Sequence, residues 1–408
     1  MKISFSLCVI VLILIELFVL RFRSILTYRN TLLASKEAVL ALKKDPTVFN
    51  SGYQILDFGY FKAGSFSKEV FRVGDTLLVK TKPCNDKECD PSYKETVFIE
   101  KVGETRFAAI MRESAKIRNL ANGVYLTNLA SPYAELLAGM TLGVKSLPKD
   151  FNDNLIKTGV IHVVVVSGFN VSLVISALFP LLLFLGRRLS LTFSFLGVLF
   201  FVLLVGFDPP IVRAAIMGLI MLYGKYKGRE RNVLMILLLA AFIMVFISPI
   251  IVYDLSFILS FLATFGLITL SPLIKEYVKL KFYGLEEDFV STLSAQIMVW
   301  PIISYCFGRI SVISPLVNVL VLWVVPLVTI MGFLYLAVSL FKISFFLSLA
   351  SLIISVPLAY FSQVVNLSAN ISFSQMEFQV SKGFLGFYYL VLAVVMLWLI
   401  RKKARMLR

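Results

Sequence analysis

The feature that most constrains this chain is a succession of long apolar segments between residues 159 and 400. Each is close to the roughly 20 residues with which a helix crosses about 30 Å of hydrocarbon. Hydrophobic residues make up 59% of the chain and the mean hydropathy is +0.87, far above the roughly half apolar composition of a soluble domain. The sequence therefore predicts an integral membrane protein.

The predicted fold is a polytopic α-helical membrane protein with about ten transmembrane helices. One is an N-terminal anchor over residues 1–22, which we interpret as retained because no small-residue cleavage site follows it. The other candidate spans lie near 159–185, 190–206, 210–226, 233–248, 251–270, 289–307, 312–340, 344–366 and 383–400.

A different pattern occupies residues 45–110, where short alternating segments such as DTLLVKTK are separated by Gly, Asn, Asp and Pro. This pattern predicts a small all-β domain inserted before the membrane part. Residues 104–145 return to helical spacing and are expected to form linking helices. The first of them is basic and amphipathic, so it either lies along a membrane surface or packs as an ordinary helix.

The loops between spans indicate the orientation, because cytoplasmic loops collect Lys and Arg. One alternate set of loops holds 15 of these residues, at 187–188, 225–231, 275–281, 342 and in the basic tail 401–408. The other set holds only Arg309 and Lys382. We therefore expect both termini in the cytoplasm and the β domain outside, although Arg21, Arg23 and Arg29 oppose this locally. Much of the net charge of +16 is accounted for in this way.

Polar residues recur inside the apolar segments, where each costs free energy unless it faces a bundle interior or a watery cavity. His162, the only histidine of the chain, lies in IHVVVVSGFNVSLVI, and Ser167 and Asn170 are spaced to share a helix face. Gly168 predicts a helix break or a close backbone approach. The set also includes Asp208, Arg213, Asp254, Ser260 and Gln296. The alternative is that these residues only hydrogen-bond helix to helix.

Prolines and cysteines add further expectations. Pro301 is expected to close its span, and the apolar stretch 312–340, with Pro315 and Pro326, is either a broken or re-entrant helix or a tilted, kinked one. Cys84 and Cys89, in PCNDKECDP, are candidates for a disulfide if their compartment is oxidising. Two cysteines without a nearby histidine make a poor zinc site, so no metal is expected.

Four segments in order resemble the ComEC family of competence DNA-uptake channels. HVVVVSGFNVSLVISAL is similar to its H-L-x-x-I-S-G-x-H-x-x-L signature and PPIVRAAIMGLIML to its P-S-V-x-R-A-x-x-M segment. YDLSFILSFLATFGLITLSPLI is similar to D-x-x-F-Q-L-S-F-x-A-x-x-G, and AQIMVWPIISYCFGRISVISPLVNVLVLWVVP to the segment that begins A-Q and contains F-G, S, N and P. Asn170 stands where the family often has a second histidine, and Ile258 where it often has glutamine.

The resemblance implies an external OB-like domain, suggested by FRVGDTLLVKT, and a competence-type channel domain over residues 155–400. It implies an inner-membrane channel of a bacterial cell that conducts single-stranded DNA into the cytoplasm during natural transformation. Because the sequence ends at Arg408, eight residues after the last predicted span, the family's metallo-β-lactamase-like domain is not expected in this chain. A single histidine cannot supply a dinuclear metal site, so a separate nuclease is expected. A DNA receptor and a cytoplasmic motor or single-strand-binding protein are the other expected partners.

The candidate DNA pathway consists of His162, Ser167, Asn170, Asp208, Arg213, Asp254, Ser260, Gln296, Arg309 and Asn318. Arg213 is the clearest candidate for a phosphate contact, its alternative being a buried pair with Asp208 or Asp254. Six aromatic residues of the β domain either stack on bases or form its core. They are Tyr53, Phe58, Tyr60, Phe61, Phe66 and Phe71. No ATP-binding motif or catalytic set is found, so neither an enzyme nor a cofactor is expected. Two other hypotheses remain: a secondary transporter of small solutes, and a membrane enzyme using His162 and Asp254.

Overall fold

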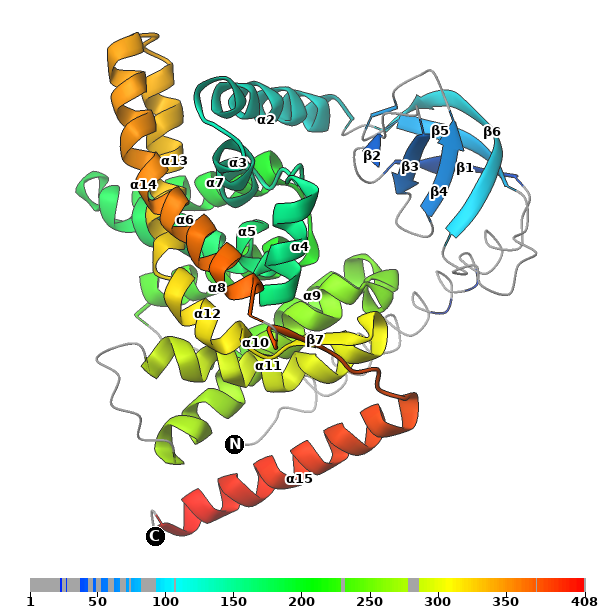
Figure 1. Ribbon diagram of the computed structural model, residues 1–408, viewed down its shortest axis with the longest axis vertical. Coiled ribbons are helices and arrows are strands. Elements are labelled where there is room, and N and C mark those ends of the chain that lie inside the picture. Colours follow the sequence, from blue (N-terminus) through cyan, green and yellow to red (C-terminus); the bar gives the residue numbers. More distant parts are fainter. Residues whose placement is uncertain are drawn as a thin grey trace. The chain divides into compact units, whose positions relative to one another are not determined.

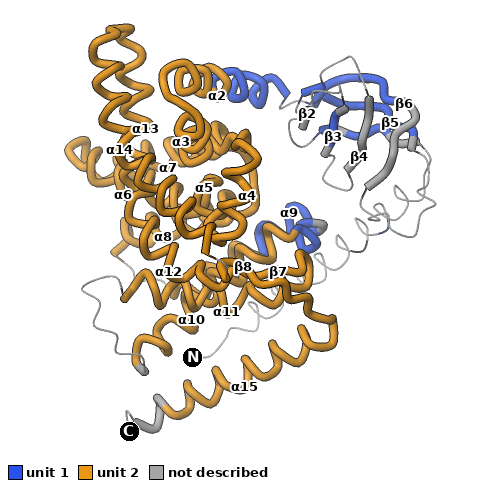
Figure 2. Tube along the Cα trace, in the orientation of Figure 1, with its two compact units in different colours: residues 1–117, 242–254 blue, residues 118–241, 255–408 orange. Residues whose placement is uncertain are grey.

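The computed structural model describes residues 108–228, 232–277, 286–371 and 373–406 (Figure 1). Before them it describes Arg23, Thr27 and the stretches 37–42, 47–48, 53–57, 62–66, 71–72, 75–81 and 93–105. The chain divides into two compact units, one containing residues 1–117 and 242–254, the other residues 118–241 and 255–408 (Figure 2). The anchor predicted over residues 1–22 lies outside the described residues, and so do Cys84 and Cys89.

The first unit contains a six-stranded sheet with the order β1-β5-β6-β4-β3-β2. Neighbouring strands are antiparallel except β4 and β6, which are parallel. The strands are β1 (Glu37–Ala41), β2 (Thr47–Val48), β3 (Tyr53–Asp57), β4 (Lys62–Phe66), β5 (Asp75–Thr81) and β6 (Tyr93–Glu104). The β domain was predicted to begin at residue 45. The sheet begins earlier, because β1, at Glu37–Ala41, pairs with β5.

The two outermost strands show that this sheet curls. β1 ends at Ala41 and β2 begins at Thr47, so the connection reaches at most about 21 Å. Six strands laid flat would separate the edges by about 24 Å. Along β5 burial alternates, and Leu77 and Val79 pack with Phe71 in a core completed by Leu40, Leu42 and Leu56. Curvature allows one face of so small a sheet to enclose that core.

Helix α2 (Ala108–Asn128) follows β6, and ion pairs secure its first turns within the first unit. Arg112 pairs with Glu104 and lies 3.6 Å from buried Asp75, which also pairs with Lys101 at 3.0 Å. These cations compensate the buried carboxylate, which would otherwise be costly. Several apolar side chains of α2, including Ile110, remain exposed. Its predicted position along a membrane surface stays a prediction.

The second unit is helical. Its elements begin with α3 (Tyr133–Leu142), α4 (Lys149–Thr158), α5 (Ile161–Val164), α6 (Gly168–Leu181), η1 (Leu183–Leu185), α7 (Arg187–Val205) and α8 (Pro209–Tyr226). α9 (Val233–Ile247) runs from this unit into the first, which also holds η2 (Pro249–Tyr253). Then come α10 (Leu255–Tyr277), α11 (Glu286–Phe307), β7 (Arg309–Ser311), α12 (Ser314–Val321), α13 (Val324–Ser339), α14 (Ser344–Ala369), β8 (Gln375–Glu377) and α15 (Lys382–Met406).

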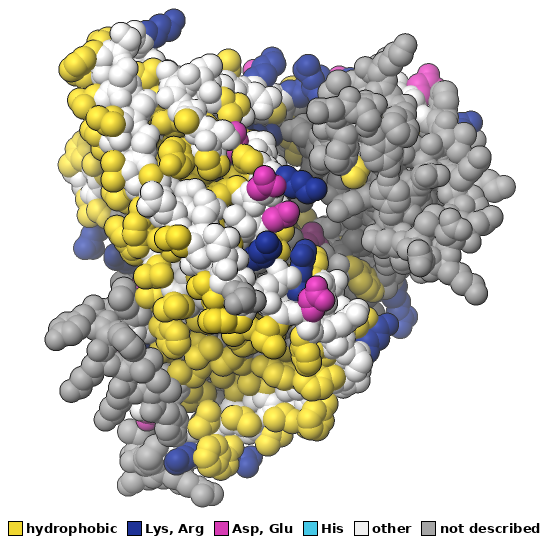
Figure 3. All heavy atoms as spheres, viewed as in Figure 1, with side chains coloured by type: hydrophobic (Ala, Val, Ile, Leu, Met, Phe, Trp, Pro, Cys, Tyr) yellow, Lys and Arg dark blue, Asp and Glu magenta, His cyan; other side chains and the backbone are white. Residues whose placement is uncertain are grey.

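Helix α3 lies at the centre of the largest core of this unit. Its Leu136, Leu137 and Met140 are fully buried and belong to one hydrophobic cluster with side chains of α13 and α14. Tyr125 of α2 donates a hydrogen bond to the Gly332 carbonyl of α13 at 2.9 Å. Hydrophobic side chains also cover much of the face of this unit that Figure 3 shows. An apolar exterior around a packed interior is typical of helices that lie in lipid.

Six helical segments of the described residues are long and apolar enough to cross a membrane, or seven if the bent α12–α13 pair is one span. The six lie in α5–α6, α7, α10, α11, α14 and α15. The predicted total of about ten transmembrane helices is therefore not confirmed. The predicted spans at α8 and α9 are not among the six. α9 has only 15 residues, and the 18 residues of α8 include two prolines, Arg213 and Lys225.

Two proline expectations have different outcomes. The stretch 312–340 is broken, since α12 and α13 are bent by 44° between Val321 and Val324. Pro326 lies in the first turn of α13, where the missing N–H is tolerated. The expectation that Pro301 closes its span is wrong, because α11 continues to Phe307. The carbonyl of Ile297, four residues before Pro301, accepts a hydrogen bond from the Tyr388 hydroxyl at 3.0 Å instead.

Candidate functional site

A polar cluster forms where α4 and α5 meet α11 and α12, centred on Ser314. Gly159 ends α4 with φ +73°, and its carbonyl lies 3.5 Å from the Ser314 hydroxyl, which donates to it. Nδ1 of His162 lies 3.0 Å from the same carbonyl. Because a carbonyl oxygen only accepts, Nδ1 carries the proton in this contact. The cluster therefore connects the predicted residue His162 to α12.

The predicted residues Gln296 and Asn318 join the same cluster. Nε2 of Gln296 donates to the Ser314 hydroxyl, and Nδ2 of Asn318 does so at 3.3 Å. Both side chains are buried. Sequence reasoning missed Ser314, although it lies four residues before Asn318 and thus one helical turn away. That spacing was the sequence signal from which Ser314 could have been predicted as a neighbour of Asn318.

A second cluster lies where α6, α8 and α10 meet. Nη1 of Arg213 donates to the Ser260 carbonyl and to the Thr264 hydroxyl, and its guanidinium lies 5.9 Å from the Phe261 ring centroid. Among the described residues Arg213 has no ion pair with Asp208, whereas Asp254 belongs to the first unit and the alternative of a pair with it stays untested. The cation of Arg213 is thus held by neutral groups.

Gly168 explains how α6 comes so close to this arginine. A Cβ at position 168 would lie 2.8 Å from Nη2 of Arg213 and 2.9 Å from Cβ of Ala214. Both expectations for Gly168 are confirmed, because the backbones approach closely and the helix is broken between Val164 and Gly168. The expected shared face of Ser167 and Asn170 is wrong, since Ser167 is the N-cap of α6 and accepts from the Phe169 N–H at 3.3 Å.

The remaining predicted residues occupy separate places. Nδ2 of Asn170 is buried and donates to the Met140 carbonyl at 2.9 Å. Asp208 precedes α8 and forms an ion pair of 3.0 Å with Lys145. Asp254 belongs to the first unit, and Arg309 is exposed on β7, opposite Glu377 of β8. A single continuous pathway through all ten residues stays a prediction.

Five of the predicted residues each have a buried polar atom that makes no hydrogen bond within the protein. The atoms Asn170 Oδ1, Arg213 Nε, Ser260 Oγ, Gln296 Oε1 and Asn318 Oδ1 are each buried without a protein partner. A buried polar atom of this kind costs about 1–3 kcal/mol, and such atoms are expected to serve a purpose other than packing. Their concentration on the helices of the two clusters indicates an interior that can bind water or a polar solute.

Apolar helices of membrane-spanning length, packed around buried polar side chains, define a multi-pass helical membrane protein. The chain belongs to the competence protein family, whose family model, described as "Competence protein", matches residues 140–403. That range contains every polar residue of the two clusters.

Curated relatives match smaller regions. ComE operon protein 3 of Bacillus subtilis (strain 168) is 33% identical over 167 residues, which is 40% of this chain and 21% of that protein. An uncharacterized protein of Aquifex aeolicus (strain VF5) is 37% identical over 121 residues, 29% of this chain and 28% of that protein. The matches thus span less than a third of either relative. No solved structure matches the chain.

Proposed function

We propose that this chain takes part in DNA uptake during competence and that its helical unit conducts a single DNA strand across the cell membrane into the cytoplasm. Membership of the competence protein family supports the general role. The observation that carries the finer proposal is Arg213, a cation between three helices whose hydrogen-bond partners are neutral. A passing phosphate is an anion that this guanidinium would bind through charge-assisted hydrogen bonds.

The Ser314 cluster contributes neutral hydrogen-bonding groups to the same pathway. Its amides and hydroxyl would contact water, sugars or phosphate oxygens without holding the strand by charge. A conducting path needs sites that are favourable enough to enter and weak enough to leave. One cation among several neutral groups satisfies that requirement better than a row of arginines would.

We assign the first unit the role of an OB-like domain outside the membrane that meets the single strand first. A small curled sheet supports this assignment, because an OB fold is a small, partly open barrel, although this sheet has six strands where an OB fold has five. Phe71 belongs to the core, so it does not stack on bases. Tyr53 and Phe66, which are opposite each other in the β3–β4 register, remain candidates. Phe58, Tyr60 and Phe61 lie outside the described residues.

The proposal is tested by following fluorescent double-stranded DNA in competent cells that lack the chain or carry variants of it. Label outside the membrane and label in the cytoplasm are scored separately. Loss of the chain is expected to leave external label intact and to abolish cytoplasmic label. Arg213→Ala is expected to lower the delivery rate about tenfold or more, the effect of losing about 1.4 kcal/mol of barrier stabilisation.

Two controls make this result specific. Lys275→Ala removes a cation at the end of α10 that pairs with Glu287, and it should leave delivery unchanged. Arg213→Lys keeps the charge without the planar fork and should retain part of the activity. Membrane abundance of each variant is measured by immunoblot. Unchanged cytoplasmic delivery in cells without the chain would contradict the channel, and saturable uptake of a small solute would favour the transporter hypothesis.

A further inference from the structure

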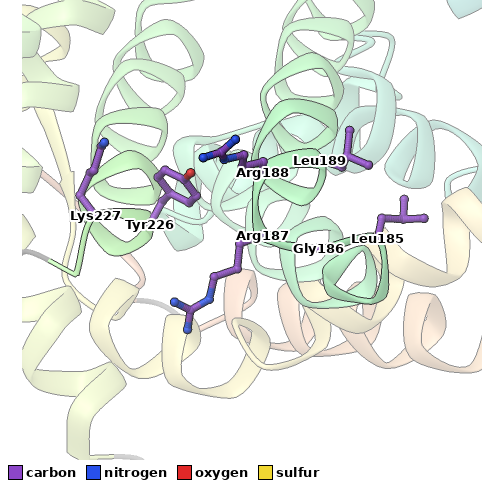
Figure 4. A pocket seen from close by; sticks show the side chains of 7 residues that line it. All are labelled: Leu185, Gly186, Arg187, Arg188, Leu189, Tyr226 and Lys227. Atoms are coloured by element: carbon purple, nitrogen blue, oxygen red, sulfur yellow. The ribbon is translucent and has the colours of Figure 1, made fainter.

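An open basic pocket of about 570 Å³ lies in the second unit, between the beginning of α7 and the end of α8. Arg187 and Arg188 extend from the first turn of α7, and Tyr226 and Lys227 come from the end of α8 (Figure 4). The hydroxyl of Tyr226 is directed toward Arg188 in this view. None of the residues lining the pocket is acidic.

The charge at this place is unusual for a helix start. The N-terminus of α7 already carries the positive end of the helix dipole, and arginines at the first two positions add like charge to it. Within the described residues, neither guanidinium forms an ion pair, and Lys227 lies over the rings of Tyr223 and Tyr226 at 5.9 and 5.8 Å. Figure 4 shows Arg188 beside Tyr226 and Arg187 directed away from both, so an anion next to Tyr226 would meet the Arg188 guanidinium and the first backbone N–H groups of a 19-residue helix, with Arg187 as a second nearby charge.

The rim of the pocket indicates which anion this is. Leu185 and Leu189 line it and are 39% and 50% exposed, and the neighbouring Phe184 is 79% exposed. Such side chains are placed to contact acyl chains. A phospholipid combines a phosphate with acyl chains in one molecule, which suits the leucines that line the pocket, whereas the bases of a nucleic-acid strand stack on aromatic rings, and the lining itself supplies one ring, Tyr226. Arg, Lys and Tyr at the end of apolar helices are also typical of the membrane interface.

We propose that this pocket binds the phosphate headgroup of an anionic phospholipid. Arg188 and the Tyr226 hydroxyl donate to the phosphate, Arg187 adds a second positive charge at the pocket, and the acyl chains cover Leu185 and Leu189. Both loops belong to the Lys- and Arg-rich set expected in the cytoplasm, where the leaflet surface is negative. The site is independent of DNA transport and would hold α7 and α8 together at the interface.

The test uses the full chain, purified and reconstituted in nanodiscs of phosphatidylcholine with or without one fifth phosphatidylglycerol. Lipid retained by the protein is measured by native mass spectrometry. The wild-type chain is expected to retain phosphatidylglycerol in preference to phosphatidylcholine. The double variant R187Q/R188Q should lose that preference by about tenfold or more, as expected from two interfacial arginines. R187K/R188K should lose less.

Two comparisons decide the source of the anion. The matched double variant K275Q/K382Q removes two charges elsewhere and should retain the lipid. A fluorescent single-stranded oligothymidine is titrated against the same proteins. The proposal is overturned if R187Q/R188Q retains phosphatidylglycerol like the wild type, or if it loses only oligothymidine binding. A monodisperse elution profile with an unchanged far-ultraviolet spectrum excludes misfolding as the cause of any loss.

Discussion

The hydroxyl of Ser314 on α12 lies 3.5 Å from the carbonyl of Gly159 at the end of α4, 155 residues away in the sequence. A Cβ at position 159 would lie 2.7 Å from both Cβ and Oγ of Ser314. The φ of +73° at Gly159 is also one that other residues rarely adopt. This contact therefore depends on glycine twice, once for its backbone conformation and once for its missing side chain.

Gly159→Ala is expected to destabilise the helical unit by about 2–4 kcal/mol, because overpacking against Ser314 adds to the backbone strain. The matched control is Gly228→Ala, which has a similar φ of +63° but no heavy atom within 4 Å of the added Cβ. Thermal unfolding of both variants in detergent compares the two effects. Equal losses of stability would show that strain alone matters and that the contact with Ser314 is loose.

Gly168→Ala is expected to destabilise the α6–α8 contact by about 1–3 kcal/mol and to lower DNA delivery. The guanidinium of Arg213 can move away from the added methyl group, but Cβ of Ala214, at 2.9 Å, cannot. Gly386→Ala on α15 meets nothing within 4 Å and is the control. Stability is measured by thermal unfolding and delivery by cytoplasmic label. Wild-type values for both would contradict the close approach.

Tyr388→Phe is expected to cost about 1–3 kcal/mol, because it leaves the Ile297 carbonyl without its donor. Pro301→Ala restores an intrahelical N–H to that carbonyl, so Tyr388→Phe should cost less in the Pro301→Ala background. A double-mutant cycle on urea unfolding measures the coupling between the two positions. Additive effects would mean that the tyrosine does not replace the donor missing at Pro301.

The first unit should lose stability in acid through Glu104. Hydrogen bonds from Arg112 and then Lys101 lower the pKa of the Glu104 carboxyl below its ordinary value. Because the folded pKa lies below the unfolded one, the stabilisation is present above the unfolded pKa and is lost as the pH falls through the folded value. Glu104→Gln should therefore weaken the pH dependence of the urea midpoint in that acid range. The exposed Glu113→Gln, at the surface of α2, is the control, and equal effects of both variants would contradict the prediction.

Local sequence patterns anticipated several features of the architecture. The break before Gly168 and the broken stretch at 312–340 were each one of two alternatives that glycine, proline and the length of the apolar run suggested, because these act on the backbone within a few residues. The family was visible because four motifs stand in order within residues 140–403. The number of spans was not reliable, because an apolar helix such as α9 resembles a membrane span whether or not it is long enough to cross.

By itself, then, the sequence determined the membrane character of the chain, its inserted β strands, its family and the polar residues that had to be accommodated. Only the tertiary structure decided which of them meet. Ser314 contacts Gly159 across 155 residues, Tyr388 reaches Ile297 across 91, and Arg213 binds Ser260 and Thr264 instead of pairing with Asp208. The physical reason is that periodicity and propensity are local, whereas these contacts depend on how separate helices pack, which no short segment encodes.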